Sequence, residues 1–225
     1  YQYRYGSSTL VAVRALYAQG GVARFYQGLG PALLQGPLSR FGDTASNAGT
    51  LALIDAYHPD LPQPAKTVVS AAVASTWRLA LMPLDTLKTM LQVEGPTGLQ
   101  TLADKLRAAG PGALFHGGAG LAASSFLGHF SWFGVYNYVD TTLPVPAHLA
   151  PLLARNAAVG LAASAVTDVL TNSIRVLKTY KQTSAEPVSY AAAARSILQK
   201  DGLPGLFARG LATRLAANGL QAALF

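Results

Sequence analysis

The sequence has no cysteine. This absence excludes disulfide bridges, thiolate catalysis and metal sites built on thiolates. The sequence also has no nucleophile–base triad and no phosphate-binding loop. The four histidines lack the spacing of a metal-binding motif and stand at His58, His116, His129 and His148. We therefore expect no cofactor, no metal site and no catalytic residue, and the sequence does not predict an enzyme.

Charged residues are scarce, at 12% of the 225 residues, while 51% are hydrophobic and the mean hydropathy is +0.28. A soluble domain has roughly a quarter charged residues. Long hydrophobic runs are also missing, because ionisable residues such as Arg78, Asp85 and Asp168 interrupt every candidate span of about 20 residues. A helical membrane bundle with a polar interior and a lipid-facing exterior fits both facts. The alternative is an alanine-rich soluble helical protein.

The net charge of +7 is not concentrated in a basic run. Nucleic-acid binding usually shows a clustered basic patch, so we expect no nucleic-acid partner. Attraction to anionic lipid headgroups accounts better for the dispersed lysines and arginines. No signal or transit segment is visible at the N-terminus.

One pattern of ionisable residues occurs twice, 90 residues apart, within otherwise apolar helical sequence. Gaps of seven and three residues place the three charges of each copy on one face of a helix. Such a face is costly in a membrane unless it lines a cavity or pairs with a neighbour. The first two charges have opposite signs in the two copies, which are Arg78, Asp85, Lys88 and Asp168, Arg175, Lys178.

The repetition extends along the whole chain. A glycine–aromatic–glycine segment recurs three times, and its last glycines are Gly28, Gly117 and Gly210. Two proline-rich breaks, at 61–64 and 143–146, separate the repeats. We expect a partial first repeat over 1–60, a second repeat over 61–145 and a third over 146–225, with a truncated last helix.

The repeats predict an all-α protein with long and short helices. Long helices are expected over 29–57, 66–93, 117–143, 148–182 and 210–225, and short surface helices over 7–19, 98–109 and 188–200. Pro83 lies inside the second long helix, where it removes a backbone hydrogen bond and bends the helix.

The segment from Pro83 to Thr89, followed by Gln92, resembles the signature of the mitochondrial carrier family. With the three repeated glycine segments, the resemblance covers nearly the whole chain. It implies a pseudo-threefold bundle of tilted transmembrane helices with short matrix-side helices, in the mitochondrial inner membrane. It also implies transport of a small solute by alternating access.

In this family, charged residues of the odd-numbered helices pair between repeats and close the matrix side of a central cavity. The resemblance gives this gating role to the two charged triads. We expect Asp85 to meet Arg175 or Lys178, and Arg78 to meet Asp168, because exchanged signs preserve pairing. The alternative to a moving gate is a permanent ion pair that connects the helices and never opens.

Polar residues of the even-numbered helices approximate the family's solute contacts. They suggest a small anionic or zwitterionic solute with Arg40 as its charge anchor. Packing is the alternative, with Arg40 and Asp43 paired and the serines bonded to backbone. The candidates are Arg40, Asp43, Ser124, Ser125, His129, Arg214 and Asn218.

Bound cardiolipin is a further implication of the resemblance, since helix N-termini bind phosphate. The candidate headgroup positions are Gly6, Gly28, Gly98, Gly117 and Gly210.

Several departures from the family pattern favour another interpretation. The first signature helix is missing from the sequence, and Ser173 and Arg175 replace the proline and the acid of the third signature. The chain can therefore also be interpreted as a carrier-fold relic, acting as an accessory subunit of a larger membrane complex. A bundle without its first helix predicts a partner that covers its open side.

Overall fold

The computed structural model describes residues 1–224, with the side chains of 137 and 220–224 left aside. The described residues form helices joined by short loops, without a strand. The predicted all-α fold is confirmed. In chain order the helices are α1 (Gln2–Tyr5), α2 (Thr9–Ala18), the 3-10 helix η1 (Gly21–Tyr26), α3 (Leu29–Tyr57), α4 (Gln63–Ala80), α5 (Met82–Glu94), α6 (Thr97–Ala109), the 3-10 helix η2 (Pro111–Phe115), α7 (Gly118–Thr142), α8 (Leu149–Thr183), α9 (Tyr190–Phe207) and α10 (Leu211–Leu224).

The long helices lie close to their predicted ranges, and α3 matches its prediction at both ends. The predicted helix over 188–200 corresponds to the first part of α9, which begins at Tyr190 and is kinked at a non-helical Gly202 with φ +65°. A second helical segment follows the kink and ends at Phe207. Residue 225, the predicted end of the last helix, lies outside the described residues.

The second long helix is broken into α4 and α5, which meet at Leu81 with a bend of 63°. Pro83 stands in the first turn of α5, where its missing N–H removes a bond that would continue α4. The corresponding position of α8 is Ser173, and α8 runs unbroken for 35 residues. Alone among the described helices, α8 is long and apolar enough to cross a membrane, and the bent pair α4–α5 passes the same test as one unit.

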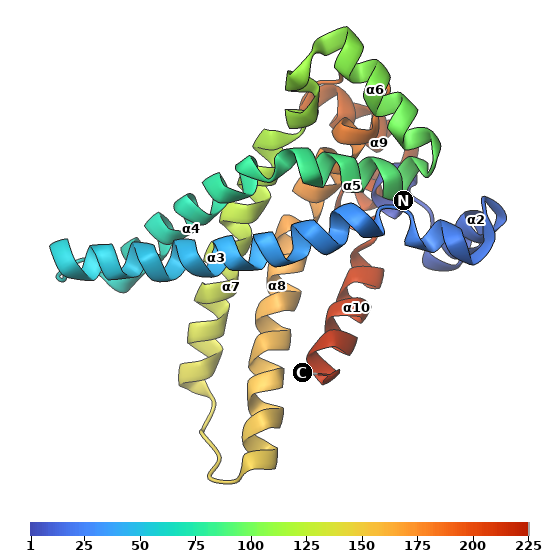
Figure 1. Ribbon diagram of the computed structural model, residues 1–225. Helices are drawn as coiled ribbons and strands as arrows, with labels where there is room; N and C mark the ends of the chain where they lie inside the picture. The colour runs from blue at the N-terminus through green and yellow to red at the C-terminus, as the bar shows by residue number, and fades with distance from the viewer. Residues whose placement is uncertain (225) are drawn as a thin grey trace.

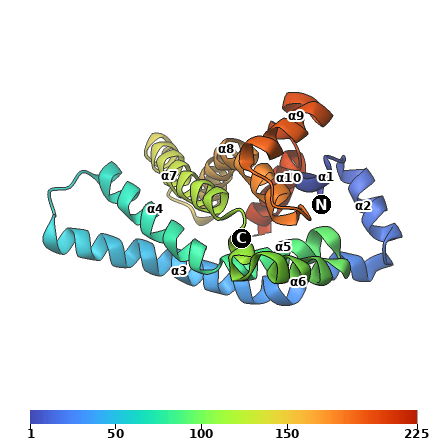
Figure 2. The same cartoon turned by 90° about the horizontal axis from the view of Figure 1, so that it is seen from above.

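The helices pack as antiparallel pairs, α3 with α4 and α7 with α8 (Figure 1). The two pairs meet near α5 and diverge toward the loops at 58–62 and 143–148, and Figure 2 shows α3 and α4 on one side of the molecule. The contact between α3 and α4 is close at Gly42, where a β-carbon would lie 1.7 Å from the ring of Trp77. This Trp77 ring also donates to the Leu38 carbonyl at 3.0 Å.

Three basic side chains connect the repeats at the end of the molecule that holds the short helices. Arg24 of η1 donates to the carbonyls of Gln92 and Val93 at the end of α5. Lys105 of α6 donates to the carbonyl of Gln182 in the last turn of α8, at 2.6 Å. Arg209 donates to two carbonyls of α1. Each cation thus caps carbonyls left free at a helix C-terminus of the next repeat in cyclic order.

Two of the repeated glycines allow a close approach beside these caps. Gly28 and Gly117 precede α3 and α7 with φ of +81° and +94°. A β-carbon on Gly28 would lie 3.0 Å from the Lys88 carbonyl, and one on Gly117 would lie 3.1 Å from Gln182. The first turns of α3 and α7 therefore rest directly on α5 and α8, which carry the charged triads.

Candidate gate and solute site

Asp85 is the centre of a polar cluster between α5 and α8, which we call the gate cluster. The residue is 4% exposed. Lys178 lies 2.6 Å from one carboxylate oxygen, and Lys88 lies 3.4 Å from the other. The structure therefore joins the first triad to the second through Asp85 and Lys178, while Arg175 takes no part in this contact.

Two glutamines complete the gate cluster. Gln35 of α3 donates to Asp85 at 3.2 Å and accepts from Lys88 at 2.5 Å. Gln182 of α8 donates to Asp85 at 3.0 Å. With two donors on each oxygen, the carboxylate has used its roughly four acceptor positions, as a buried ion requires. The cluster ties α3, α5 and α8 together at the end where the helix pairs meet.

A second cluster links α3, α4 and α7. Both nitrogens of the Arg78 fork bind the Asp43 carboxylate, with the Nε contact at 2.9 Å. His129 of α7 places Nε2 3.6 Å from Asp43 and Nδ1 2.8 Å from the Ser125 carbonyl. These side chains are 18–30% exposed, so solvent reaches part of the cluster.

A third cluster gathers around Asp168 of α8, whose side chain is 3% exposed. Arg175 lies two turns further along α8 at 3.3 Å, and Arg214 of α10 lies at 2.5 Å. Asn218, one turn beyond Arg214, also donates to this carboxylate. Two arginines therefore share one carboxylate, and the side chain of Arg214 is still 36% exposed.

Two predicted contacts are wrong. Arg78 does not meet Asp168, because it binds Asp43 on the neighbouring helix α3. Arg40 does not pair with Asp43, although the two lie three residues apart. Arg40 is exposed, and no partner for it is found among the described side chains. The face of α3 that carries Asp43 is turned toward α4, which leaves Arg40 outside the cluster.

The serines of α7 bond within their own helix. Ser124 is buried and donates to the Leu121 carbonyl at 3.1 Å. Ser125 contributes its backbone carbonyl to His129. For Ser124 the geometry is that of the packing alternative, in which the side chain bonds to backbone.

The three clusters together contain more cations than anions. Five cationic side chains, Arg78, Lys88, Arg175, Lys178 and Arg214, share the carboxylates of Asp43, Asp85 and Asp168. Two positive charges therefore lack a carboxylate of their own. Such an excess attracts anions, and its effect is strongest where water is partly excluded.

The profile described as "Mitochondrial carrier protein" matches residues 60–145 and 151–225, which is more than two thirds of the chain. The chain belongs to the mitochondrial carrier family. Members of this family carry solutes across the mitochondrial inner membrane and are transporters rather than enzymes. Among curated proteins, none matches the sequence.

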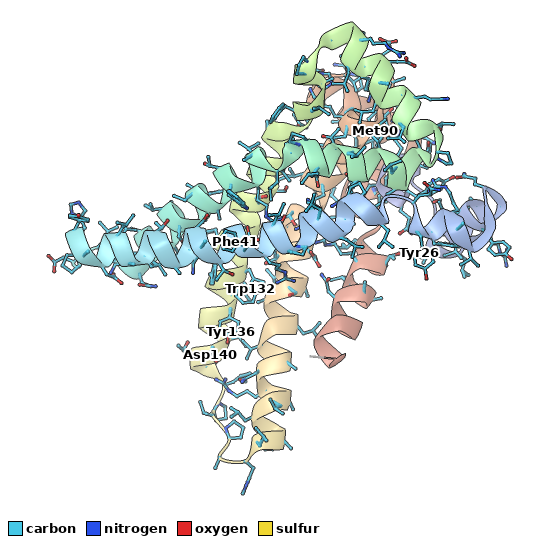
Figure 3. All side chains as sticks on the ribbon, viewed as in Figure 1. Tyr26, Phe41, Met90, Trp132, Tyr136 and Asp140 are labelled. Atoms are coloured by element: carbon cyan, nitrogen blue, oxygen red, sulfur yellow. The ribbon has the colours of Figure 1, made fainter. Side chains whose placement is uncertain are left out.

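Sequence reasoning did not find two ion pairs of this carrier, which lie at the loops opposite the gate cluster. Lys66 of α4 binds Asp55 of α3, and Arg155 of α8 binds Asp140 of α7 at 2.7 Å. Figure 3 shows Asp140 near the free end of α7, below Trp132 and Tyr136. Each pair joins consecutive helices across a short loop. The sequence feature that could have predicted it is an acidic and a basic residue on opposite sides of a proline-rich break.

Of the glycines proposed for lipid binding, two line a surface pocket and three lie in contacts between helices. Gly6 and Gly210 line one surface pocket of about 410 Å³, at the N-termini of α2 and α10. Gly28 and Gly117 are buried in the helix contacts described above, and Gly98 packs against the carbonyl of Met90. The structure brings only Gly6 and Gly210 of this set together.

A second pocket of about 320 Å³ lies between α6 and the loop after α8. Its lining includes Lys105, His116 and Glu186. Burial lowers the pKa of Lys105 to about 8, and the nearby charge of Arg4 acts in the same direction. Burial also lowers the pKa of His116. Neither position was a predicted site, because no spacing in the sequence sets them apart.

Proposed function

We propose that this protein transports a small anionic solute across the mitochondrial inner membrane by alternating access. Family membership supports transport as such. The observation that supports an anion is the excess of cations, since five basic side chains share three carboxylates in the gate cluster and its two neighbours. A zwitterion also fits the three clusters. Their basic side chains can bind its anionic group, while Asp43 or Asp168 can bind its ammonium group.

The charge anchors of the solute are Arg175 and Arg214 rather than Arg40. Both arginines contact one oxygen of Asp168, so an incoming carboxylate or phosphate can take over one of them without leaving a buried ion unpaired. Asn218 adds a neutral donor one turn away on α10. Arg78 of the second cluster is the further candidate, held by Asp43 and reachable from solvent.

The gate cluster supports the alternating-access part of the proposal. Asp85 binds Lys178 and both glutamines through hydrogen bonds that water can replace, so the contact can open without exposing apolar core. We propose that it closes the matrix end of the solute path in the arrangement described above. A permanent ion pair between the helices would have the same contacts as a gate, and it would differ only in never opening.

Cardiolipin is the lipid we propose for the pocket beside Gly6 and Gly210. The N-termini of α2 and α10 direct backbone N–H groups toward this region, and free N–H groups of this kind bind phosphate. Arg209, which also lines the pocket, is held by Asp201. Lipid binding here ties the first and last repeats together.

Uptake by liposomes tests the proposal. The purified chain is reconstituted and given labelled phosphate, dicarboxylates, amino acids and organic cations in turn. We expect an anion or a zwitterion to accumulate and the cations to be excluded. Arg175→Ala and Arg214→Ala should each lower this uptake at least tenfold, as expected when a charged contact to substrate is lost. Arg14→Ala is the control, because Arg14 is exposed on α2.

The accessory-subunit interpretation gives the opposite result. If no member of the panel accumulates while the reconstituted protein is folded, the transport proposal fails. The charged clusters then act as fixed connections between helices in a larger complex.

A further inference from the structure

We infer that Lys105 of α6 is an acylation site, whose amine reacts with short acyl thioesters that enter the pocket between α6 and the loop after α8. This pocket measures about 320 Å³, and Lys105 forms part of its wall together with Ala108, His116 and Glu186. The three charged clusters contribute none of the residues that line it. The inference therefore does not depend on which solute the carrier transports.

The first observation is that Lys105 is buried without a counter-ion. Lys66 and Lys105 are both buried, with 9% and 8% of their surface exposed. Lys66 binds the Asp55 carboxylate, whereas no ion pair of Lys105 is found among the described residues. Its hydrogen bond goes to the Gln182 backbone carbonyl, at 2.6 Å. A buried ammonium group that faces only a neutral acceptor is costly, so this environment favours the neutral amine.

The charges around Lys105 support the same form of the side chain. Burial lowers the pKa of Lys105 to about 8, the charge of Arg4 lowers it further, and Glu94 opposes both. The ionisable groups that share the pocket wall with Lys105 are Asp104, His116 and Glu186. At pH 8 about half of the Lys105 side chains are then neutral, against roughly one in 250 for an ordinary exposed lysine. The neutral amine is the form that attacks a carbonyl carbon.

Loss of the proton leaves the contact between Lys105 and Gln182 in place. A neutral amine still has two N–H groups, so it can donate one to the Gln182 carbonyl while its lone pair becomes available. The amine is thus held at the wall of a pocket that is large enough for a short acyl group. The caps made by Arg24 and Arg209 cannot react in this way, because a guanidinium keeps its proton.

The reaction needs no partner other than the thioester. Nζ of Lys105 forms a bond to the carbonyl carbon, and the carbon–sulfur bond breaks. The amine proton leaves with the sulfur, which gives an amide and a free thiol. The amide carries no charge, so acylation weakens the cap at the C-terminus of α8. Gln182, whose carbonyl is capped, also donates to Asp85, so the modification reaches the gate cluster through one residue.

Acetylation of the full chain in detergent micelles tests the inference. The protein is incubated at pH 8 with a small acetyl thioester, the acetyl thioester of N-acetylcysteamine, and mass spectrometry measures the rate at each lysine. We expect Lys105 to react about tenfold faster than Lys200, which is exposed on α9. The difference in neutral fraction alone is about a hundredfold, but a less basic amine is also a weaker nucleophile. In urea the two lysines should react at the same rate.

A pocket-filling variant tests the route to Lys105. Ala108→Phe places a ring on the exposed surface of α6 that lines the pocket, and it should slow acetylation of Lys105 at least fivefold without changing Lys200. Ala191→Phe, at an exposed alanine of α9 outside the pocket, is the matched control and should change neither rate. The inference is overturned if folded Lys105 reacts no faster than Lys200, if its advantage persists in urea, or if Ala108→Phe leaves its rate unchanged.

Discussion

Asp85 is a buried carboxylate that neutralises two neighbouring ammonium groups. It is 4% exposed and holds Lys178, Lys88 and two glutamine amides around one carboxylate. Two ammonium groups lie beside it, so the carboxylate also prevents their mutual repulsion. The effect of a substitution here is therefore set by what it leaves unpaired.

Asp85→Asn keeps the shape of the side chain and removes its charge. We expect it to destabilise the folded carrier by about 3 kcal/mol or more, because Lys88 and Lys178 then lie half-buried without a counter-ion. Thermal unfolding in detergent measures the change. Asp104→Asn breaks an exposed pair with Arg107, where both side chains are over 70% exposed, and should cost about 1 kcal/mol or less. Equal losses in the two variants would show that the gate cluster is not a buried ion pair.

Lys105 gives the stability of the carrier a dependence on alkaline pH. Burial lowers its pKa from 10.5 to about 8. Between these values the unfolded chain holds a proton that the folded chain has lost, so stability rises with pH across this window. The slope contributed by one group is at most about 1.4 kcal/mol per pH unit.

Lys105→Met removes this contribution. The unfolding temperature of the native chain should rise from pH 8 to pH 10 relative to that of Lys105→Met. Lys200→Met, at an exposed position, should follow the native curve. Parallel curves for the native chain and Lys105→Met would contradict the lowered pKa.

The spacing of residues along a helix determines which of them share a face, but it does not determine which neighbouring helix that face contacts. Spacing along one helix correctly placed Asp85 and Lys178 on facing surfaces. It could not say which neighbour Arg78 faces, because that depends on helix order and rotation, and Arg78 binds Asp43 instead of Asp168. Arg40 shows the same limit, since a helix rotated by a fraction of a turn buries Asp43 and exposes Arg40.

At the scale of elements, the two long helices that carry the charged triads, α4–α5 and α8, differ in shape. The α4–α5 helix bends by 63° beside Pro83, while α8 continues past Ser173 without a break. The bend was predictable, because a proline removes a fixed hydrogen bond. Its size was not, because packing against α3 and α7 sets how far the two halves separate. The first part of α9 ends at the kink at Gly202, close to the predicted end at residue 200, while the short helical segment between this kink and Phe207 was not predicted.

Pro83→Ala should straighten the α4–α5 helix. Because the chain lacks cysteine, spin labels can be attached at Gln63→Cys and Glu94→Cys alone. With a rise of about 1.5 Å per residue and the bend of 63°, straightening lengthens the span between these positions by roughly 7 Å. Pulsed electron resonance measures the distance. Ser173→Ala in the same labelled chain is the control and should leave the distance unchanged. An unaltered distance in Pro83→Ala would mean that packing alone holds the bend.

At the scale of the whole molecule, the repeats are joined in a cycle at one end and diverge at the other (Figure 1). The cycle consists of the caps made by Arg24, Lys105 and Arg209 on the carbonyls of other repeats. These cations stand at different places within their repeats, so the sequence repeat did not reveal them. Together with the gate cluster, they hold one end closed while the helix pairs separate toward the opposite loops.

We propose that the gate cluster opens during transport. Thr86→Cys with Gln182→Cys places two thiols where the side chains now approach to 3.3 Å. The double variant removes the Gln182 amide from the gate cluster and leaves Asp85, Lys88, Lys178 and Gln35 in place, so its uptake before cross-linking is the reference. A short, reducible cross-linker then locks α5 to α8. Each single-cysteine variant, treated with the same reagent, controls for modification alone.

The measurement is uptake, by liposomes containing the double-cysteine variant, of the anion that accumulates best in the panel. We predict that cross-linking reduces uptake to background and that a reductant restores it. Uptake that continues unchanged through the cross-link would contradict the account, because solute would then cross without any opening between α5 and α8.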